Sequence, residues 1–128
     1  MNQWHDGTII GKAQSFEEAA LFMKNASKHP SIVCSSYVIY SYKSVNNSWE
    51  LIQSCSGSVS TKIWCCFDED DIKHYISVMG DKVLTYSGGF SIMDSGMQYV
   101  KKIEGSYSAI IGLPLCEVRY DLKKMGFM

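Results

Sequence analysis

Residues 88–114 carry the most specific pattern of this chain, in three short motifs: GGFSI at 88–92, YVKKIEGSY at 99–107 and IIGLP at 110–114. The two adjacent glycines free the backbone before apolar segments, so the pattern predicts strands over Phe90–Met93 and Met97–Ile103. Glu104-Gly105 predicts a turn. A proline is typical of a first helical turn, which predicts a last helix from Pro114 to about Met125 that ends at Gly126.

Upstream of these motifs the chain alternates helical and β-rich segments. Ser15 and Glu18 form a capping-box pattern, and Asp68 begins an acidic stretch that favours a second helix start. The expected elements are a helix from Ser15 to about Ser27, a long strand over Ile32–Tyr42, a turn at Asn46–Ser48, a return strand over Trp49–Ser54, a third strand over Val59–Phe67 after Gly57, and a helix from Asp68 to Gly80. This order predicts one α/β domain over residues 1–128 with a mixed sheet.

Composition narrows the classes of protein to which the chain can belong. The sequence is 46% hydrophobic and 20% charged with a formal net charge of −1, which is ordinary for a globular chain. Basic residues form no patch, so we expect no nucleic-acid partner. No apolar run is long enough to span a bilayer and the start is too polar for a signal peptide, so we expect no membrane partner and a cytoplasmic location.

The five cysteines predict reduced thiols rather than a disulfide framework or a metal site. They are odd in number, contain no Cys-x-x-Cys and have no histidine at zinc-like spacing. The three histidines, His5, His29 and His74, are isolated in the sequence. The acidic run at 68–71 is expected to favour the positive end of a helix rather than to hold a metal.

The one basic residue at a turn entering a helix is Lys12, preceded by Gly11. An ammonium at such a turn can approach phosphate oxygens as a compact point charge. The plainer interpretation is a solvated lysine, since most lysines are exposed.

Taken together, the motifs resemble the Maf (septum-formation-like) family of nucleotide pyrophosphatases. The residues that carry the resemblance are the 88–114 motifs, DGTIIGK at 6–12 and FEEAA at 16–20. It implies an elongated mixed sheet flanked by helices, in an inosine-triphosphatase-like fold. It also implies hydrolysis of a nucleoside triphosphate to a monophosphate and pyrophosphate with Mg²⁺ or Mn²⁺. Lys12 is then the implied catalytic residue that holds the triphosphate, with Ala13 in place of the family's proline.

Several family residues have no counterpart in this sequence. The phosphate-gripping Ser-x-Ser-Pro-Arg-Arg loop would precede Met1, and a following aspartate would fall at or just before it. The resemblance therefore implies a fold truncated at its N-terminus. Met93 stands where the family has a polar Gln or Glu, and Thr85-Tyr86 replaces an acidic-basic pair. The implied metal ligand set is therefore incomplete, and we expect the pyrophosphatase activity of this chain to be absent or impaired.

Several alternatives remain open from the sequence. Glu104 and Ser35-Ser36 either approach the substrate, as the resemblance implies, or bond locally. The start at Met1 reflects either an internal start of a longer protein or a shortened paralogue that binds a nucleotide or a protein without catalysis. A further alternative is an interaction protein, since loss of an N-terminal strand would expose a sheet edge and favour a homodimer.

Overall fold

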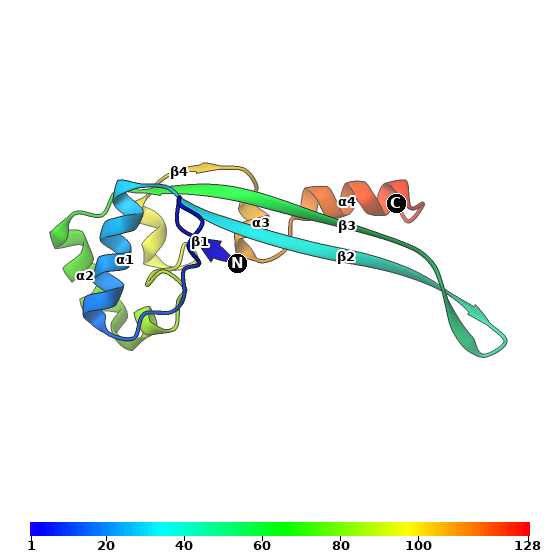
Figure 1. Cartoon of the computed structure of the whole chain (residues 1–128), viewed down its shortest axis with the longest axis horizontal. Coiled ribbons are helices and arrows are strands. Elements are labelled where there is room, and N and C mark those ends of the chain that lie inside the picture. The colour runs from blue at the N-terminus through cyan, green and yellow to red at the C-terminus, as the bar shows by residue number, and fades with distance from the viewer.

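The computed structural model describes all 128 residues as an α/β fold built around one long hairpin (Figure 1). Its elements are β1 (Asn2–Gln3), α1 (Phe16–Lys28), β2 (Ser31–Val45), β3 (Ser48–Cys65), α2 (Glu69–Met79), η1 (Gly80–Leu84), η2 (Ser95–Tyr99), β4 (Val100–Glu104), α3 (Tyr107–Ile111) and α4 (Leu115–Lys124). In Figure 1, α1 and α2 gather at one end of the sheet, while α3 and α4 lie along the hairpin.

The four strands form one sheet in the order β1-β2-β3-β4. All three neighbouring pairs are antiparallel, where the sequence predicted a mixed sheet. The central strands β2 and β3 must be antiparallel, because a two-residue hairpin turn can join only antiparallel strands. The two outer strands are short, so most of the length of β2 and β3 is paired on one side only.

The hairpin turn lies at Asn46 and Asn47, which have φ angles of 50° and 65°. Two successive residues in this left-handed region form the type I′ turn that matches the twist of the strands, and asparagine tolerates the conformation. The predicted turn at Asn46–Ser48 is therefore confirmed to within one residue.

The prediction of two separate strands over Trp49–Ser54 and Val59–Phe67 is wrong, because β3 is continuous from Ser48 to Cys65. Gly57 does not interrupt the strand. It lies directly opposite Tyr37 in the register, and the tyrosine ring covers the space where a side chain would stand. The Tyr37 hydroxyl continues across to donate a hydrogen bond to Asp121 Oδ2 of α4 at 2.6 Å.

The first two helices begin where their caps predict. Ser15 Oγ accepts the backbone N–H of Glu18 at 3.1 Å, although only this half of the predicted capping box forms. A full box forms at α2 instead, where Asp68 and Asp71 each accept the other's backbone N–H. The acidic run at 68–71 thus caps a helix, as the sequence predicted.

The segment after Gly89 differs most from the sequence prediction. Phe90–Met93 is not a strand, and the residues of η2 form a 3-10 helix before β4 begins at Val100. Asp94 accounts for this local structure, because its carboxylate accepts the N–H of Gly96 at 2.7 Å and so favours a helical turn. The short helix α3 was not predicted, although Ser106 caps it by accepting the N–H of Ala109.

The core lies between α1, α2 and the base of the hairpin. Phe67 is at its centre, with its ring stacked on Tyr99 at 4.5 Å between centroids and edge-on to Phe90 at 5.2 Å. Fully buried Met23 and Val83 complete the packing from α1 and η1. The C-terminal helix is predicted within one residue at each end and buries no residue fully. None of the helices has the length and hydropathy needed to cross a membrane.

The Tyr37–Gly57 pair gives a test of how the hairpin is held. A Cβ atom at position 57 would stand 2.5–2.9 Å from three atoms of the Tyr37 side chain. We expect Gly57→Ala to displace the ring from Asp121 and to lower the free energy of unfolding by about 1–3 kcal/mol in urea denaturation. In a Tyr37→Ala background the same substitution should cost almost nothing.

The matched control for this cycle is Gly11→Ala, since a Cβ there would meet no atom within 4 Å. Equal losses at positions 11 and 57, or an unchanged cost of Gly57→Ala without the tyrosine, would contradict the assigned contact.

Candidate functional site

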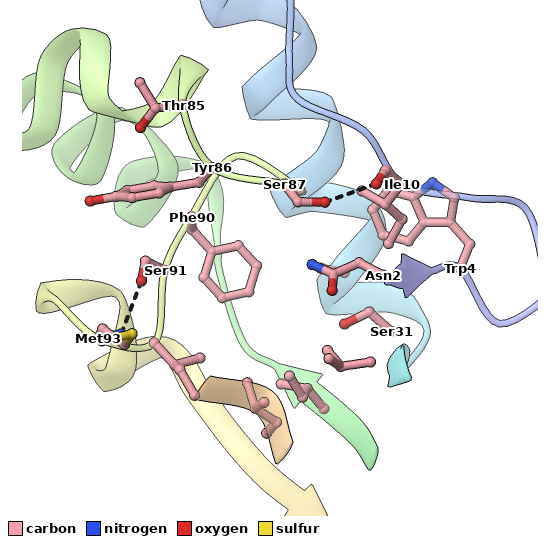
Figure 2. Close-up of a pocket in the computed structure, with 16 residues that line it drawn as sticks. Asn2, Trp4, Ile10, Ser31, Thr85, Tyr86, Ser87, Phe90, Ser91 and Met93 are labelled. Atoms are coloured by element: carbon pink, nitrogen blue, oxygen red, sulfur yellow. Dashed lines mark hydrogen bonds between the residues drawn. The ribbon is translucent and has the colours of Figure 1, made fainter. Parts of the chain in front are cut away.

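A pocket of about 260 Å³ opens where the N-terminal segment, the start of β2 and the loop after η1 meet (Figure 2). Its lining is largely apolar at the base, with a few polar side chains toward the opening. The lining residues are Asn2, Trp4, Ile10, Ala26, Ser31, Val33, Ile63, Thr85, Tyr86, Ser87, Gly88, Phe90, Ser91, Ile92, Met93 and Ile110. None of them carries a formal charge.

Two hydrogen bonds hold the N-terminal segment against the loop at 85–93. Ser87 Oγ donates to the carbonyl oxygen of Ile10 at 2.8 Å, drawn as a dashed line in Figure 2. The N–H of Gly88 donates to the carbonyl oxygen of Gly11 at 3.1 Å. Gly88 has a φ of 81°, which suits glycine, and this backbone conformation lets the loop approach the N-terminal segment at Gly11. The GG motif therefore builds one wall of the pocket.

The far wall is positioned by Tyr75 of α2, which is 1% exposed. Its hydroxyl accepts the N–H of Ser91 at 3.2 Å and donates to the Asp94 carboxylate at 3.0 Å. Burial raises the pKa of Tyr75, and the negative charge of Asp94 adds to that shift. Tyr86 also has a raised pKa, chiefly because of its interaction with the Asp94 carboxylate. Asp94 thus holds Tyr75 and does not line the pocket.

Lys12 lies beside the pocket and not within its lining. The residue is exposed, and its backbone forms an isolated antiparallel bridge with Ser87, which does line the pocket. The predicted phosphate-holding lysine is therefore next to the wall formed by 87–88. Its catalytic role stays a prediction.

The other residues considered from the sequence divide between the pocket and elsewhere. Met93 and the pair Thr85-Tyr86 line the pocket. Ser35 does not, because its hydroxyl donates to the carbonyl oxygen of Ala109. Glu104 is also elsewhere, in an exposed ion pair with Lys102 at 3.6 Å. Neither residue lines the pocket, and neither makes the expected local bond: Ser35 bonds to α3 and not to a neighbouring serine, and Glu104 pairs with a side chain and not with the turn backbone.

The structure holds no group of three or more His, Cys, Asp or Glu side chains that could bind a metal ion. It does bring together two histidines that are far apart in the sequence. The rings of His5 and His29 stack with centroids 4.0 Å apart, and both residues are exposed. All five cysteines are free thiols, and burial raises the pKa of Cys65 to about 12.

Asn2 and Trp4 are among the pocket residues that the sequence analysis did not predict. Asn2 and Trp4 precede Lys12 by only a few residues, and β1 carries them to the pocket by pairing with Ile32 and Val33. The available signal was their place in the same segment as the DGTIIGK motif. A two-residue strand is too short to be recognised from periodicity.

A family model described as "Maf-like protein" matches residues 3–125, so the chain belongs to this family. The α/β fold with an elongated sheet flanked by helices, which the resemblance implied, is confirmed.

The chain is similar to several pyrophosphatases. It is 30% identical over 121 residues to a dTTP/UTP pyrophosphatase of Geobacter metallireducens, covering 94% of this chain and 59% of the relative. It is 29% identical over 122 residues to a dTTP/UTP pyrophosphatase of Fusobacterium nucleatum (95% and 59%), and 31% identical over 126 residues to a nucleoside triphosphate pyrophosphatase of Prochlorococcus marinus (94% and 59%). The chain thus spans less than three fifths of the length of these relatives.

Removal of the Tyr75 hydroxyl tests the support of the pocket wall. Tyr75→Phe leaves the Ser91 N–H without its acceptor, so we expect a loss of about 1–3 kcal/mol in the free energy of unfolding. The pKa of Tyr75 is higher in the folded chain than in the unfolded chain. The Tyr75 hydroxyl therefore contributes its full stabilisation below about pH 10, and this contribution is lost as the pH rises above 10. The fall in stability from pH 9 to 11 should therefore be shallower in Tyr75→Phe.

Tyr42→Phe is the control for this measurement, since Tyr42 is 52% exposed. If the free energy of unfolding falls equally steeply above pH 10 in the native chain and in Tyr75→Phe, Tyr75 is not the group responsible for the fall.

Proposed function

We propose that the pocket binds the nucleoside end of a nucleoside triphosphate. Its lining is uncharged and includes the rings of Trp4 and Phe90, which suit a planar base. In Figure 2 the Asn2 amide lies between these rings and the hydroxyl of Ser31. An amide offers both donors and an acceptor to the edge of a base. The observation that carries the proposal is this neutral, partly aromatic lining in a chain whose family model covers residues 3–125.

The triphosphate would lie outside the pocket on the side of Lys12. No cation lines the pocket, so burying several negative charges inside it would be strongly unfavourable. Lys12 is exposed and bridged to Ser87 on the pocket wall, and its ammonium can meet phosphates that emerge there. This arrangement supports binding of the nucleotide with the base inside and the phosphates at the rim.

The reaction proposed for this site is hydrolysis of a nucleoside triphosphate to a monophosphate and pyrophosphate. The relatives named as pyrophosphatases of dTTP and UTP support a pyrimidine nucleotide as substrate. Since the chain spans less than three fifths of their length, activity and substrate are both proposals for this protein.

The residues present do not fit a metal held by the protein at this pocket. Mg²⁺ and Mn²⁺ prefer oxygen ligands from carboxylates, and the pocket lining contains none. Asp94, which follows the lining residue Met93 in the chain, is engaged with Tyr75 and Gly96. A divalent cation would reach the site on the phosphates of the nucleotide. The lining also has no carboxylate to activate water, so we propose that hydrolysis by this chain is slow or absent.

A second candidate function is nucleotide binding without catalysis. It is favoured by Met93, which is 70% exposed at the pocket and has no strong hydrogen-bonding group. The two candidates share the same pocket and differ only in turnover. The proposed location is the cytoplasm, because free thiols persist in reducing compartments.

Binding is tested by titration calorimetry with UTP, dTTP and ATP in the presence of Mg²⁺. We expect UTP or dTTP to bind, and Lys12→Ala to weaken binding by about 5–10-fold, as the loss of one charge-assisted contact implies. Uridine alone should bind equally to both forms, because Lys12 contacts only phosphate.

The control variant is Lys124→Ala, which removes an exposed lysine from α4. If Lys12→Ala and Lys124→Ala bind UTP equally, Lys12 is not the phosphate contact. If Asn2→Ala leaves nucleoside binding unchanged, the pocket is not the base site.

Turnover is tested by pyrophosphate release beside the Geobacter metallireducens relative under the same conditions. We expect this chain to be at least about 100-fold slower, since loss of one stabilising donor alone costs that much. A rate close to that of the relative would contradict the proposed impairment. A measurable rate that Lys12→Ala leaves unchanged would remove Lys12 from the catalytic site.

A further inference from the structure

The C-terminal helix α4 lies along the hairpin, and three side-chain hydrogen bonds connect the two (Figure 1). The Tyr37 hydroxyl donates to Asp121 Oδ2 at 2.6 Å, and the Gln53 amide donates to the carbonyl oxygen of Met125 at 3.1 Å. The third bond joins two sulfur atoms, because the Cys55 thiol donates to Met125 Sδ at 3.5 Å. None of these residues lines the pocket, so the sulfur pair is separate from the proposed nucleotide site.

The two sulfurs meet between β3 and the end of α4. Cys55 is two residues from Gly57, the partner of Tyr37, so its side chain points to the face along which α4 lies. Met125 directly follows the last residue of α4, and its N–H donates to the carbonyl oxygen of Asp121 at 2.9 Å. Both sulfur-bearing residues are partly exposed, so an ion from solution can reach them.

The spacing of the two sulfurs suits one bridging metal ion. A metal–sulfur bond is about 2.3 Å long, so two sulfurs on one ion lie no more than about 4.6 Å apart. At the observed 3.5 Å, an ion at bonding distance from both would subtend an angle of about 100° between them. The unbranched methionine side chain can widen this angle by rotation. The pair therefore needs no movement of the backbone to hold an ion.

A thiol and a thioether together select a soft ion. Sulfur ligands of these two kinds favour Cu(I), whereas Mg²⁺ and Mn²⁺ favour oxygen. A structural Zn²⁺ site needs four ligands, and no group of three His, Cys, Asp or Glu side chains is present. Cu(I) can be held by two sulfurs alone, so the donor set fits this ion best.

The charge beside the sulfurs is negative. The hydrogen bond to Asp121 chiefly raises the pKa of Tyr37 to about 12, and the negative charges of Asp121 and Glu117 add to the shift. Glu117 Oε2 is buried without a hydrogen-bond partner, and neither carboxylate forms an ion pair. Burial raises the pKa of Cys55, and Asp121 adds to that shift while Lys124 opposes it. A field that holds a proton on the thiol also stabilises a metal cation there.

We propose that Cys55 Sγ and Met125 Sδ bind one Cu(I) ion between β3 and the end of α4. The ion takes the place of the proton that now joins the two sulfurs. The S–H bond of Cys55 breaks, a bond from Sγ to Cu(I) forms, Met125 Sδ donates a lone pair to the ion, and the proton leaves to water. One positive charge replaces another, and no oxidant or reductant is needed. The bound ion fastens α4 to the hairpin.

The site is tested by NMR with Ag⁺, a diamagnetic ion that shares the preference of Cu(I) for sulfur. The full chain carries Cys66→Ser and Cys116→Ser, because these two thiols are exposed and would bind Ag⁺ by themselves. Its seven methionines are labelled at the methyl carbon, and Met125→Leu assigns the signal of Met125. We expect the first equivalent of Ag⁺ to shift the Met125 methyl signal more than any other.

The affinity for Cu(I) is measured in the same background without oxygen, by competition with a Cu(I) chelator. Met125→Leu keeps the volume of the side chain and removes the thioether, so we expect binding to weaken by about 10-fold. Cys55→Ser removes the thiolate and should weaken binding by about 100-fold. Met128→Leu is the matched control, since Met128 is 64% exposed at the end of the chain and should leave the affinity unchanged.

Circular dichroism checks that each variant is folded, and the Ag⁺ shift is measured without altering either ligand. The proposal is overturned if the Met125 methyl signal stays in place at one equivalent of Ag⁺. Equal affinities of Met125→Leu and Met128→Leu for Cu(I) would also overturn it. So would an affinity that Cys55→Ser leaves unchanged, because the ion would then be bound by Cys34 or Cys65.

Discussion

The register of β2 against β3 is the constraint on which the rest of the structure depends. Side chains alternate between the two faces of a strand. A slip of one residue would therefore exchange the face that contacts the C-terminal helices and the opposite face along the whole hairpin. The type I′ turn at Asn46 and Asn47 sets this register at one end. The Tyr37–Gly57 pair and the hydrogen bond from Tyr37 to Asp121 set it in the middle. The C-terminal helices can therefore dock in one position only.

The sequence predicted those elements whose signals are local. Ser15 and Asp68 gave both main helix starts, because a cap is a contact between residues three apart. The prediction that a strand break lies at Gly57 was wrong. The side chain that covers Gly57 belongs to Tyr37, twenty residues away in the sequence, and this contact has no local signal. Phe90–Met93 was mistaken for a strand because its fold is set by Asp94 and by Tyr75 of another element. Tertiary contacts overrode the apolar pattern at both places.

The site was predictable in part for the same reason. The family motifs drew attention to 85–93 and to Lys12, and the structure brings the backbones of these segments together at Ser87. Asn2 and Trp4 could not be predicted, since they reach the pocket through a two-residue strand with no periodic signal. The stacked pair of His5 and His29 was missed because a turn and a helix end meet only in the folded chain.

The two faces of β2 separate the proposed nucleotide site from the exposed apolar side chains near the tip of the hairpin. Ser31 and Val33, which line the pocket, occupy odd positions at the base of the strand. Tyr40 and Tyr42, which are largely exposed, occupy even positions toward the tip. No side chain can serve both surfaces, because odd and even positions point to opposite sides of the sheet. A substitution at Tyr40 or Tyr42 should therefore leave the lining of the pocket unchanged, because any effect would have to pass through the strand itself.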